Sequence, residues 1–152
     1  MINKKFTSKN CVTCKRCMIE CSIRHSQSQD LFLSQFEKPS PVSRIKISYR
    51  KDKPYATYCQ NCAKPKCKQS CEYGAITKFE DGNVVIDQAK CTGCWACIDA
   101  CPFKAITKET EMSVAINCDD CKGYDDKACV EACKTSALNY IETKISETAE
   151  VG

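Results

Sequence analysis

Cysteine accounts for 16 of the 152 residues, and every cysteine belongs to one of four sets of four. The sets are Cys11, Cys14, Cys17 and Cys21; Cys59, Cys62, Cys67 and Cys71; Cys91, Cys94, Cys97 and Cys101; and Cys118, Cys121, Cys129 and Cys133. Each set begins C-x2-C and ends C-x3-C. Clustered thiolates are ligands for soft metals, so the pattern predicts metal centres.

The spacing within the sets indicates iron–sulfur clusters. The first and third sets follow the C-x2-C-x2-C-x3-C order of bacterial iron–sulfur proteins, and Pro102 follows the third set. A [4Fe-4S] cube needs one thiolate for each iron, and a short loop with three cysteines serves three of them. The last two cysteines of a set lie about 6 Å apart along a turn of helix. The fourth cysteine is therefore expected to ligate the other cluster of a pair.

Disulfides and zinc are the alternatives for these cysteines. The stretch before Cys11 has no apolar run typical of a signal peptide, which predicts a cytoplasmic protein whose thiols stay reduced. Zinc ribbons use two cysteine pairs with a longer spacer, whereas three of the four sets place a third cysteine within a few residues. A zinc-stapled interaction module remains the alternative of a different functional class.

The composition also points to a core that contains cofactors. Leu, Ile, Val and Phe together number 27, which is few for an apolar core in a chain of 152 residues. No stretch is long enough to span a membrane, so direct membrane insertion is not expected. The formal net charge of +4 comes without the aromatic residues that interleave with basic ones in single-strand binders, so nucleic acid is not an expected partner.

Two β-hairpins are expected, one after the second set and one after the third. The β-prone residues 74–80 and 83–87 are joined by Asp81-Gly82, a strong hairpin signal. Residues 105–117 repeat this arrangement with a looser turn.

The segment between the first two sets carries three further expectations. Ile45 and Ile47 alternate with polar residues, which predicts one half-exposed strand. The apolar residues of segment 31–36 are expected to pack on the body of the protein, and contact with a partner is the alternative. The single histidine, His25, is expected to be solvated or to cap a helix, and tuning of a nearby cluster or a proton relay is the alternative. It is not needed as a ligand, because the cysteines already form complete sets.

With these four sets in place, the chain resembles the four-cluster iron–sulfur subunits of the dimethyl sulfoxide reductase and formate dehydrogenase type, over about residues 9–142. The resemblance implies two ferredoxin-like halves with four [4Fe-4S] clusters, in which the first set pairs with the fourth and the second with the third. The ligand sets that it implies are called sites 1 to 4. They are, in order, Cys11, Cys14, Cys17 and Cys133; Cys21, Cys118, Cys121 and Cys129; Cys59, Cys62, Cys67 and Cys101; and Cys71, Cys91, Cys94 and Cys97.

The expected fold is α+β, with tandem bacterial-type 2[4Fe-4S] ferredoxin-like modules, short β-hairpins and short helices around a cluster-filled core. It would occupy residues 1–142, and residues 143–152 are expected to form a flexible tail. Its parts would be the first cluster motif at 11–21, an inserted segment at 22–58, a central ferredoxin-like module at 59–117 and the fourth cluster motif at 118–142.

Within that family, the short chain and the stretch CMIECSIRHSQSQDLF (residues 17–32) look most like the small subunit associated with carbon monoxide dehydrogenase. This likeness implies a non-catalytic electron-transfer subunit. It would relay electrons from carbon monoxide dehydrogenase to a hydrogenase, a flavin oxidoreductase or another acceptor. The alternative in the same class is the electron-transfer subunit of a formate dehydrogenase/hydrogenase complex. The sequence shows no nucleophile–base pair and no phosphate-binding glycine loop, as expected for a relay rather than an enzyme.

Overall fold

Short strands pair into four two-stranded antiparallel sheets in the computed structural model, which describes residues 2–142. The pairs are β1 (Ile2–Phe6) with β8 (Leu138–Glu142), β2 (Lys46–Arg50) with β3 (Lys53–Thr57), β4 (Ile76–Lys78) with β5 (Val84–Ile86), and β6 (Thr107–Glu109) with β7 (Val114–Ile116). The helices are α1 (Arg16–Arg24), α2 (Lys66–Gln69), α3 (Ala96–Ala100) and α4 (Ala128–Glu131), with 3-10 turns η1 (Ser8–Asn10) and η2 (Leu33–Phe36). The α+β fold of short hairpins and short helices is thus confirmed, while the tail expected at 143–152 lies outside the described residues.

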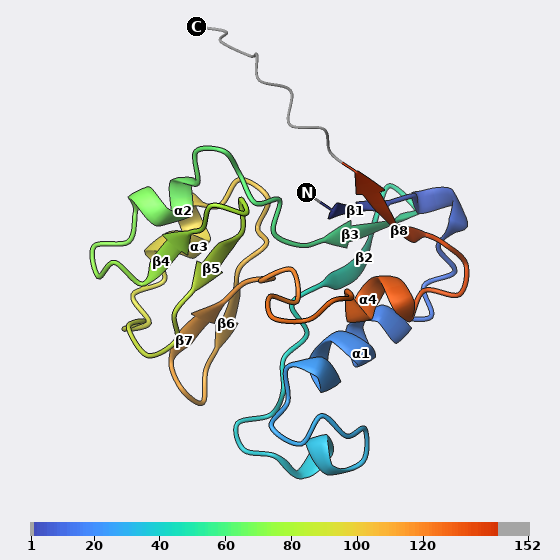
Figure 1. Ribbon diagram of the computed structural model, residues 1–152, viewed down its shortest axis with the longest axis horizontal. Coiled ribbons are helices and arrows are strands. Elements are labelled where there is room, and N and C mark those ends of the chain that lie inside the picture. The colour runs from blue at the N-terminus through green and yellow to red at the C-terminus, as the bar shows by residue number, and fades with distance from the viewer. Residues whose placement is uncertain (1, 143–152) are drawn as a thin grey trace, which may run out of the picture.

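The two ends of the chain form one side of the molecule, and its middle forms the other (Figure 1). On the first side, β1 pairs with β8 and α1 packs with α4. On the other side, α2 packs with α3 beside the hairpins β4–β5 and β6–β7. The first and fourth cysteine sets therefore share one side, and the second and third sets share the other. Of the helices in the described range, none has the length and apolar character needed to cross a membrane.

Both predicted hairpins are confirmed. Strands β4 and β5 flank Asp81-Gly82, where Gly82 has a φ of 84° and the Phe79 N–H donates to the Asn83 carbonyl oxygen at 2.8 Å. The positive φ explains the glycine, because such a turn suits a residue without a Cβ. Strands β6 and β7 form the second hairpin in the region predicted for it.

The half-exposed strand predicted around Ile45 and Ile47 is also confirmed, as β2. It begins at Lys46, directly after Ile45, and both isoleucine side chains are buried. It is one half of a hairpin, because β3 pairs with it across Lys51 and Asp52. These two turn residues have φ values of 50° and 57°. Left-handed conformations at both central residues are typical of a tight hairpin turn, but the sequence there lacks the glycine that would have predicted it.

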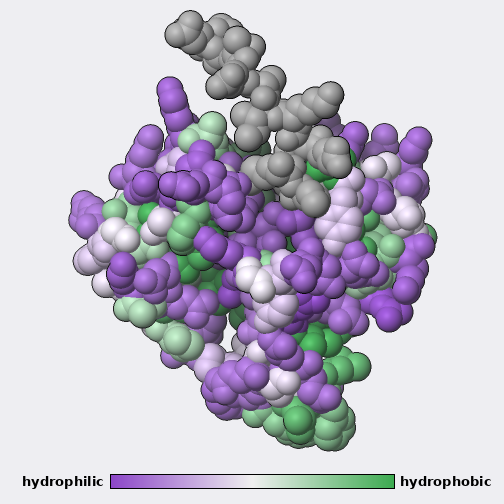
Figure 2. All heavy atoms as spheres, viewed as in Figure 1, coloured by the Kyte–Doolittle hydropathy of each residue, from purple (hydrophilic) through white to green (hydrophobic). Residues whose placement is uncertain are grey.

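The prediction that segment 31–36 packs on the body of the protein is wrong. Its four large apolar side chains are between 56% and 73% exposed, and Phe32 and Phe36 contact each other edge to face with their ring centroids 5.5 Å apart. The segment is shaped by hydrogen bonds, since the Asp30 carboxylate accepts from the N–H groups of Phe32 and Leu33. Figure 2 shows hydrophobic atoms at the lower tip of the molecule, where Figure 1 places this segment.

Two clusters of buried side chains form the core, and cysteines belong to both. One includes Ile45 and Leu138, and the other includes Val84 and Ala115. The half-buried Cys59 packs against both clusters. The cysteines therefore lie where an ordinary domain of this size has larger apolar side chains, as the composition predicts.

Candidate metal centres

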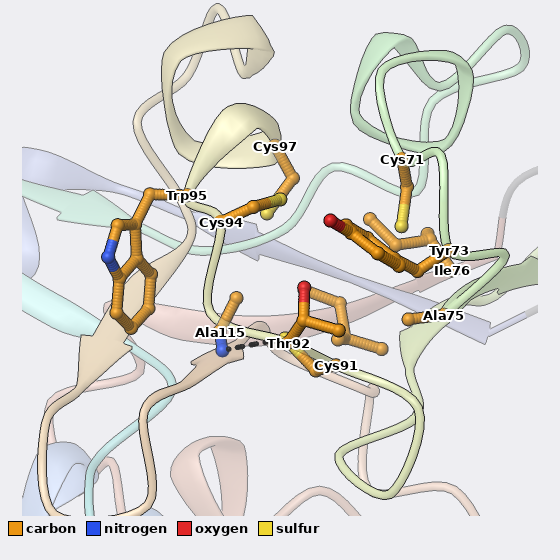
Figure 3. Close-up of a pocket in the computed structure, with 11 residues that line it drawn as sticks. Cys71, Tyr73, Ala75, Ile76, Cys91, Thr92, Cys94, Trp95, Cys97 and Ala115 are labelled. Atoms are coloured by element: carbon orange, nitrogen blue, oxygen red, sulfur yellow. Dashed lines mark hydrogen bonds between the residues drawn. The ribbon is translucent and has the colours of Figure 1, made fainter.

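The four cysteines of site 4 line one pocket, which contains about 320 Å³ of free space including its open mouth (Figure 3). Cys71 follows α2 and belongs to the second set, whereas the other three belong to the third. Figure 3 shows the sulfur atoms of Cys71, Cys94 and Cys97 turned toward the space between the loop of the third set and the chain that follows α2. Ala75 and Ile86 contribute to the apolar wall. Burial, followed by the neighbouring thiolates of the same site, raises the pKa of Cys97 to about 11.

The four cysteines of site 3 line a second pocket of similar size, with about 380 Å³ of free space including its mouth. Three of them belong to the second set, and Cys101 joins them from the third. Val84 and Asn117 complete part of the wall. Burial, followed by the charges of nearby thiolates that include Cys59 and Cys101, raises the pKa of Cys67 to about 11.

On the other side of the molecule, the thiols of site 1 are also brought together. Cys17, in α1, feels the charges of Cys133, Cys14 and Cys11, and burial together with these neighbours raises its pKa to about 11. Cys133 follows α4 and belongs to the fourth set. A cysteine of the last set thus joins three cysteines of the first.

Site 2 takes three cysteines from the fourth set and one from the first, and its cysteines are the most deeply buried of the four sites. Its cysteines, Cys21, Cys118, Cys121 and Cys129, are each between 4% and 6% exposed. Burial raises the pKa of Cys129, and the charges of the other three thiolates add to this effect against the opposing charge of Lys4. Each of the other three sites includes at least one cysteine that is exposed or half-buried.

The loops of the first and third sets share an unusual backbone conformation. Thr13 and Lys15 have φ values of 56° and 57°, and Gly93 and Trp95, at the same places in their loop, have 71° and 65°. Lys15 and Trp95 each stand directly before a helix, α1 or α3. The repeated cysteine spacing therefore corresponds to a repeated fold of the chain, in which left-handed residues turn the loop around the space that the cysteines enclose.

Backbone amides donate hydrogen bonds to several of the cysteine sulfurs. The donor and acceptor pairs are Thr13 N with Cys11 Sγ at 3.4 Å, Arg44 N with Cys21 Sγ at 3.3 Å, Ala115 N with Cys91 Sγ at 3.3 Å, and Leu138 N with Cys133 Sγ at 3.3 Å. Figure 3 draws the bond from Ala115. Such amides stabilise a thiolate, and hydrogen bonds to sulfur also help to set the potential of an iron–sulfur centre.

The donor sets fit [4Fe-4S] clusters chemically, because each gathers four thiols, and the pockets of sites 3 and 4 are walled in part by apolar side chains. Within residues 2–142, no group of three or more His, Cys, Asp or Glu side chains is placed to hold a single metal ion.

His25 is less exposed than the sequence suggests. Its backbone caps the C-terminus of α1, so the predicted capping role is confirmed. Its side chain, however, is only 10% exposed. Its Nδ1 lies 2.7 Å from the Cys21 carbonyl oxygen, and its Nε2 lies 3.0 Å from Asp119 Oδ1. Burial opposes the charged form, but the hydrogen bonds with Asp119 and Cys21 raise the pKa of His25 to about 9. The prediction of a solvated side chain is therefore wrong.

Charged side chains that no sequence pattern predicted surround site 2. Arg44 pairs with Asp119 at 2.6 Å, and Lys4 pairs with Asp120 at 2.5 Å. Burial raises the pKa of Asp119, but the hydrogen bond from His25 and the charge of Arg44 outweigh this and lower it to about 2. The only signal in the sequence was the Asp119-Asp120 pair directly after Cys118. Arg44 and Lys4 lie far from this pair along the chain, whereas Lys127, the second partner of Asp120, lies near it.

Comparison with known proteins decides the family. The family described as "4Fe-4S dicluster domain" matches residues 53–143. The chain belongs to this family. It is a ferredoxin-like electron-transfer protein with [4Fe-4S] clusters, and its α+β fold is of the small ferredoxin-like kind.

Full-length relatives and solved structures extend this likeness over almost the whole chain. The chain is 31% identical to "Putative electron transport protein YsaA" of Escherichia coli over 88% of its own length and 85% of the relative's. It is 26% identical to "Thiosulfate reductase electron transfer subunit PhsB" of Salmonella typhi, covering 87% and 71%. It spans only 21% of another relative, "Putative oxidoreductase AegA" of Escherichia coli. A chain of the active site complex BamBC of benzoyl coenzyme A reductase shares the fold, with a TM-score of 0.52, 20% identity and coverage of 99% and 82%.

Proposed function

We propose that the chain holds four [4Fe-4S] clusters in sites 1 to 4 and relays single electrons between a catalytic oxidoreductase and a second redox partner. When bound, each cluster supplies a centre that accepts and releases one electron. The observation that carries this proposal is the gathering of four thiols at every site, each time three from one set and one from another.

The packing supports a relay that runs through the length of the molecule. Cys59 of site 3 packs against both groups of buried core side chains. The group that includes Ile45 and Leu138 also contains Cys118 of site 2. Asn117 joins the same two sites, because it lines the pocket of site 3 and its side chain donates to the carbonyl oxygen of Cys118. Sites 2 and 3 are therefore the inner pair, and sites 1 and 4 are the outer pair.

The outer sites are the proposed places of electron exchange. Cys14 of site 1 and Cys94 of site 4 are the two exposed cysteines among the described residues. Electron transfer between proteins requires a close approach, so an exposed ligand is the natural contact point for a partner. We assign one outer site to the catalytic partner and the other to the second partner.

The catalytic partner is proposed to belong to a dehydrogenase or reductase complex of the formate dehydrogenase/hydrogenase kind rather than to be carbon monoxide dehydrogenase. PhsB, a relative over most of its length, is by its name the electron transfer subunit of a thiosulfate reductase. That relationship favours the broader class of partners over the one that residues 17–32 suggested. The proposed location is the cytoplasm.

Metal analysis of the anaerobically purified chain tests the cluster proposal. We expect about sixteen iron atoms and as many sulfides per chain, together with the brown colour of iron–sulfur proteins. About four zinc ions with almost no iron or sulfide would instead establish the zinc-stapled module. The partner is tested separately by anaerobic affinity capture from the native cells: a molybdenum enzyme supports the proposed class, and a nickel–iron carbon monoxide dehydrogenase contradicts it.

A further inference from the structure

Lys4 is a buried lysine whose ammonium group faces a cysteine of site 2. It lies in β1, is 5% exposed, and its Nζ donates to Cys118 Sγ at 3.1 Å. The same nitrogen pairs with Asp120 Oδ1 at 2.5 Å and lies 4.9 Å from the centre of the Tyr58 ring. A buried ammonium group needs such partners, because its removal from water is otherwise strongly unfavourable. The surroundings of Lys4 thus hold a cation directly against the sulfur.

The Asp120 carboxylate does not fully neutralise the charge of Lys4, because a second lysine pairs with the same carboxylate. Lys127 Nζ pairs with Asp120 Oδ2, and the side chains of Lys127 and Asp120 are only 11% and 4% exposed. Two ammonium groups therefore contact one carboxylate, and these three described side chains together carry one positive charge beside Cys118.

Three further charged groups lie at site 2, namely Arg44, Asp119 and His25. Arg44 and Asp119 form an ion pair at 2.6 Å, and His25 hydrogen-bonds to the same carboxylate at 3.0 Å. They contact the site at two cysteines. The Cys21 sulfur accepts from the Arg44 backbone N–H and lies 3.9 Å from His25 Nδ1, and the Cys121 N–H donates to Asp119 Oδ1 at 3.1 Å. They are separate from the group formed by Lys4, Asp120 and Lys127.

Lys4 differs in kind from the donors found at the outer sites. There the sulfurs of Cys11, Cys133 and Cys91 accept from neutral backbone amides. Each outer site also has one exposed cysteine, so water can stabilise added negative charge. Site 2 has four buried cysteines and lacks that help. A fixed cation is the substitute that its interior provides.

We propose that Lys4 sets the reduction potential of site 2 and keeps this buried inner site reducible. The inference rests on the proposed ligands of site 2. Reduction adds one electron, hence one negative charge, to a cluster and its thiolates. A cation hydrogen-bonded to a ligand sulfur stabilises the reduced form more than the oxidised form and so raises the potential. Lys4 acts through Cys118 and is a positioning residue for electron transfer.

The test is an anaerobic redox titration of the full, cluster-loaded chain with dithionite, followed by electron paramagnetic resonance. Lys4→Met and Lys127→Met each remove one positive charge and should lower one of the four midpoint potentials. For Lys4→Met the reduction equilibrium should shift by at least about tenfold, or about 59 mV for one electron. Asp120→Asn removes the negative charge and should raise the same potential. Lys4→Arg should keep it near the wild-type value.

Lys5→Met is the matched control, because Lys5 is the exposed neighbour of Lys4 on the same strand, and it should change none of the potentials. The affected signal belongs to site 2 if Cys121→Ser alters that same signal. Unchanged potentials in fully loaded Lys4→Met protein overturn the inference and leave the cluster assignment intact. A chain that binds no iron overturns the proposed function and the inference with it.

If Lys4→Met does not load with iron, the other two charge variants decide. A purely structural role for this group of residues predicts that Lys127→Met and Asp120→Asn change the potential in the same direction or leave it unchanged. Either result overturns the inference, and shifts of opposite sign support it.

Discussion

The Cys101 thiol lies in the pocket of Cys67, while Cys97, four residues earlier in the same set, lies in a different pocket. Cys97 is in α3 and Cys101 directly follows it, so one short helix presents cysteines to two sites. Helix α2 does the same in the opposite direction: Cys67, within it, lines the pocket of site 3, and Cys71, just after it, lines the pocket of site 4. The two packed helices thus exchange their last cysteines, which is the geometry that two neighbouring clusters require.

Replacing Cys101 with Ser should damage site 3 and leave site 4 intact, because Cys101 lines only the pocket of site 3. We expect the loss of the site 3 signal in electron paramagnetic resonance, with at most about four iron atoms lost per chain. Cys71→Ser is the mirror control and should damage site 4 alone. Loss of the site 4 signal in the Cys101 variant, with site 3 preserved, would contradict the exchange.

The parts of the structure that sequence predicted well depend on residues close together in the chain. The Asp81-Gly82 hairpin and the strand at Ile45 and Ile47 follow from a local turn signal and from alternation of polar and apolar residues, respectively. In each case the backbone conformation is determined within about ten residues, so a single sequence contains the necessary information.

The parts that sequence did not predict depend on contacts between distant segments. Lys4 meets Cys118 across 114 positions, and His25 meets Asp119 across 94. No periodicity connects such residues, so lysine at position 4 looked like part of an ordinary polar N-terminus. The prediction for segment 31–36 was wrong for a different reason. Its apolar residues predicted burial, but local hydrogen bonds to Asp30 shape the segment, and the body of the protein does not cover it.

Gly93→Ala should strongly destabilise the loop of site 4. Gly93 has a φ of 71°, and an added Cβ would lie 2.3 Å from the Ser113 carbonyl oxygen. The left-handed conformation alone costs about 1–2 kcal/mol, and the backbone clash adds to it. We expect faster cluster loss in urea, followed as bleaching of the brown colour.

Gly74→Ala is the matched control for that substitution, because Gly74 has a φ of 63° and nothing within 4 Å of an added Cβ. It should show only the conformational cost. Equal rates of bleaching in the two variants would mean that the contact with Ser113 has no influence on stability.

Leu138 and Phe36 should respond very differently to truncation, although both are large and apolar. Leu138 is 2% exposed, and Leu138→Ala should lower the free energy of unfolding by about 2–5 kcal/mol. Phe36 is 73% exposed, and Phe36→Ala should change it by no more than about 0.5 kcal/mol. The shift of the urea midpoint, measured anaerobically on loaded protein, gives both values. A large loss of stability in Phe36→Ala would mean that segment 31–36 packs on the body in solution.

Removal of the clusters should unfold the chain cooperatively rather than empty a preformed scaffold. Both core clusters of buried side chains include cysteines, and few large apolar residues would remain to hold α1 against α4 or α2 against α3. Metal binding and folding are coupled in such small domains. Oxidation with ferricyanide in the presence of a chelator should therefore abolish the helical circular dichroism signal and the urea transition. Iron and sulfide added back under reducing conditions should restore both, whereas zinc should not. A chelated chain that kept a sharp urea transition would show that the apolar core is sufficient without the clusters.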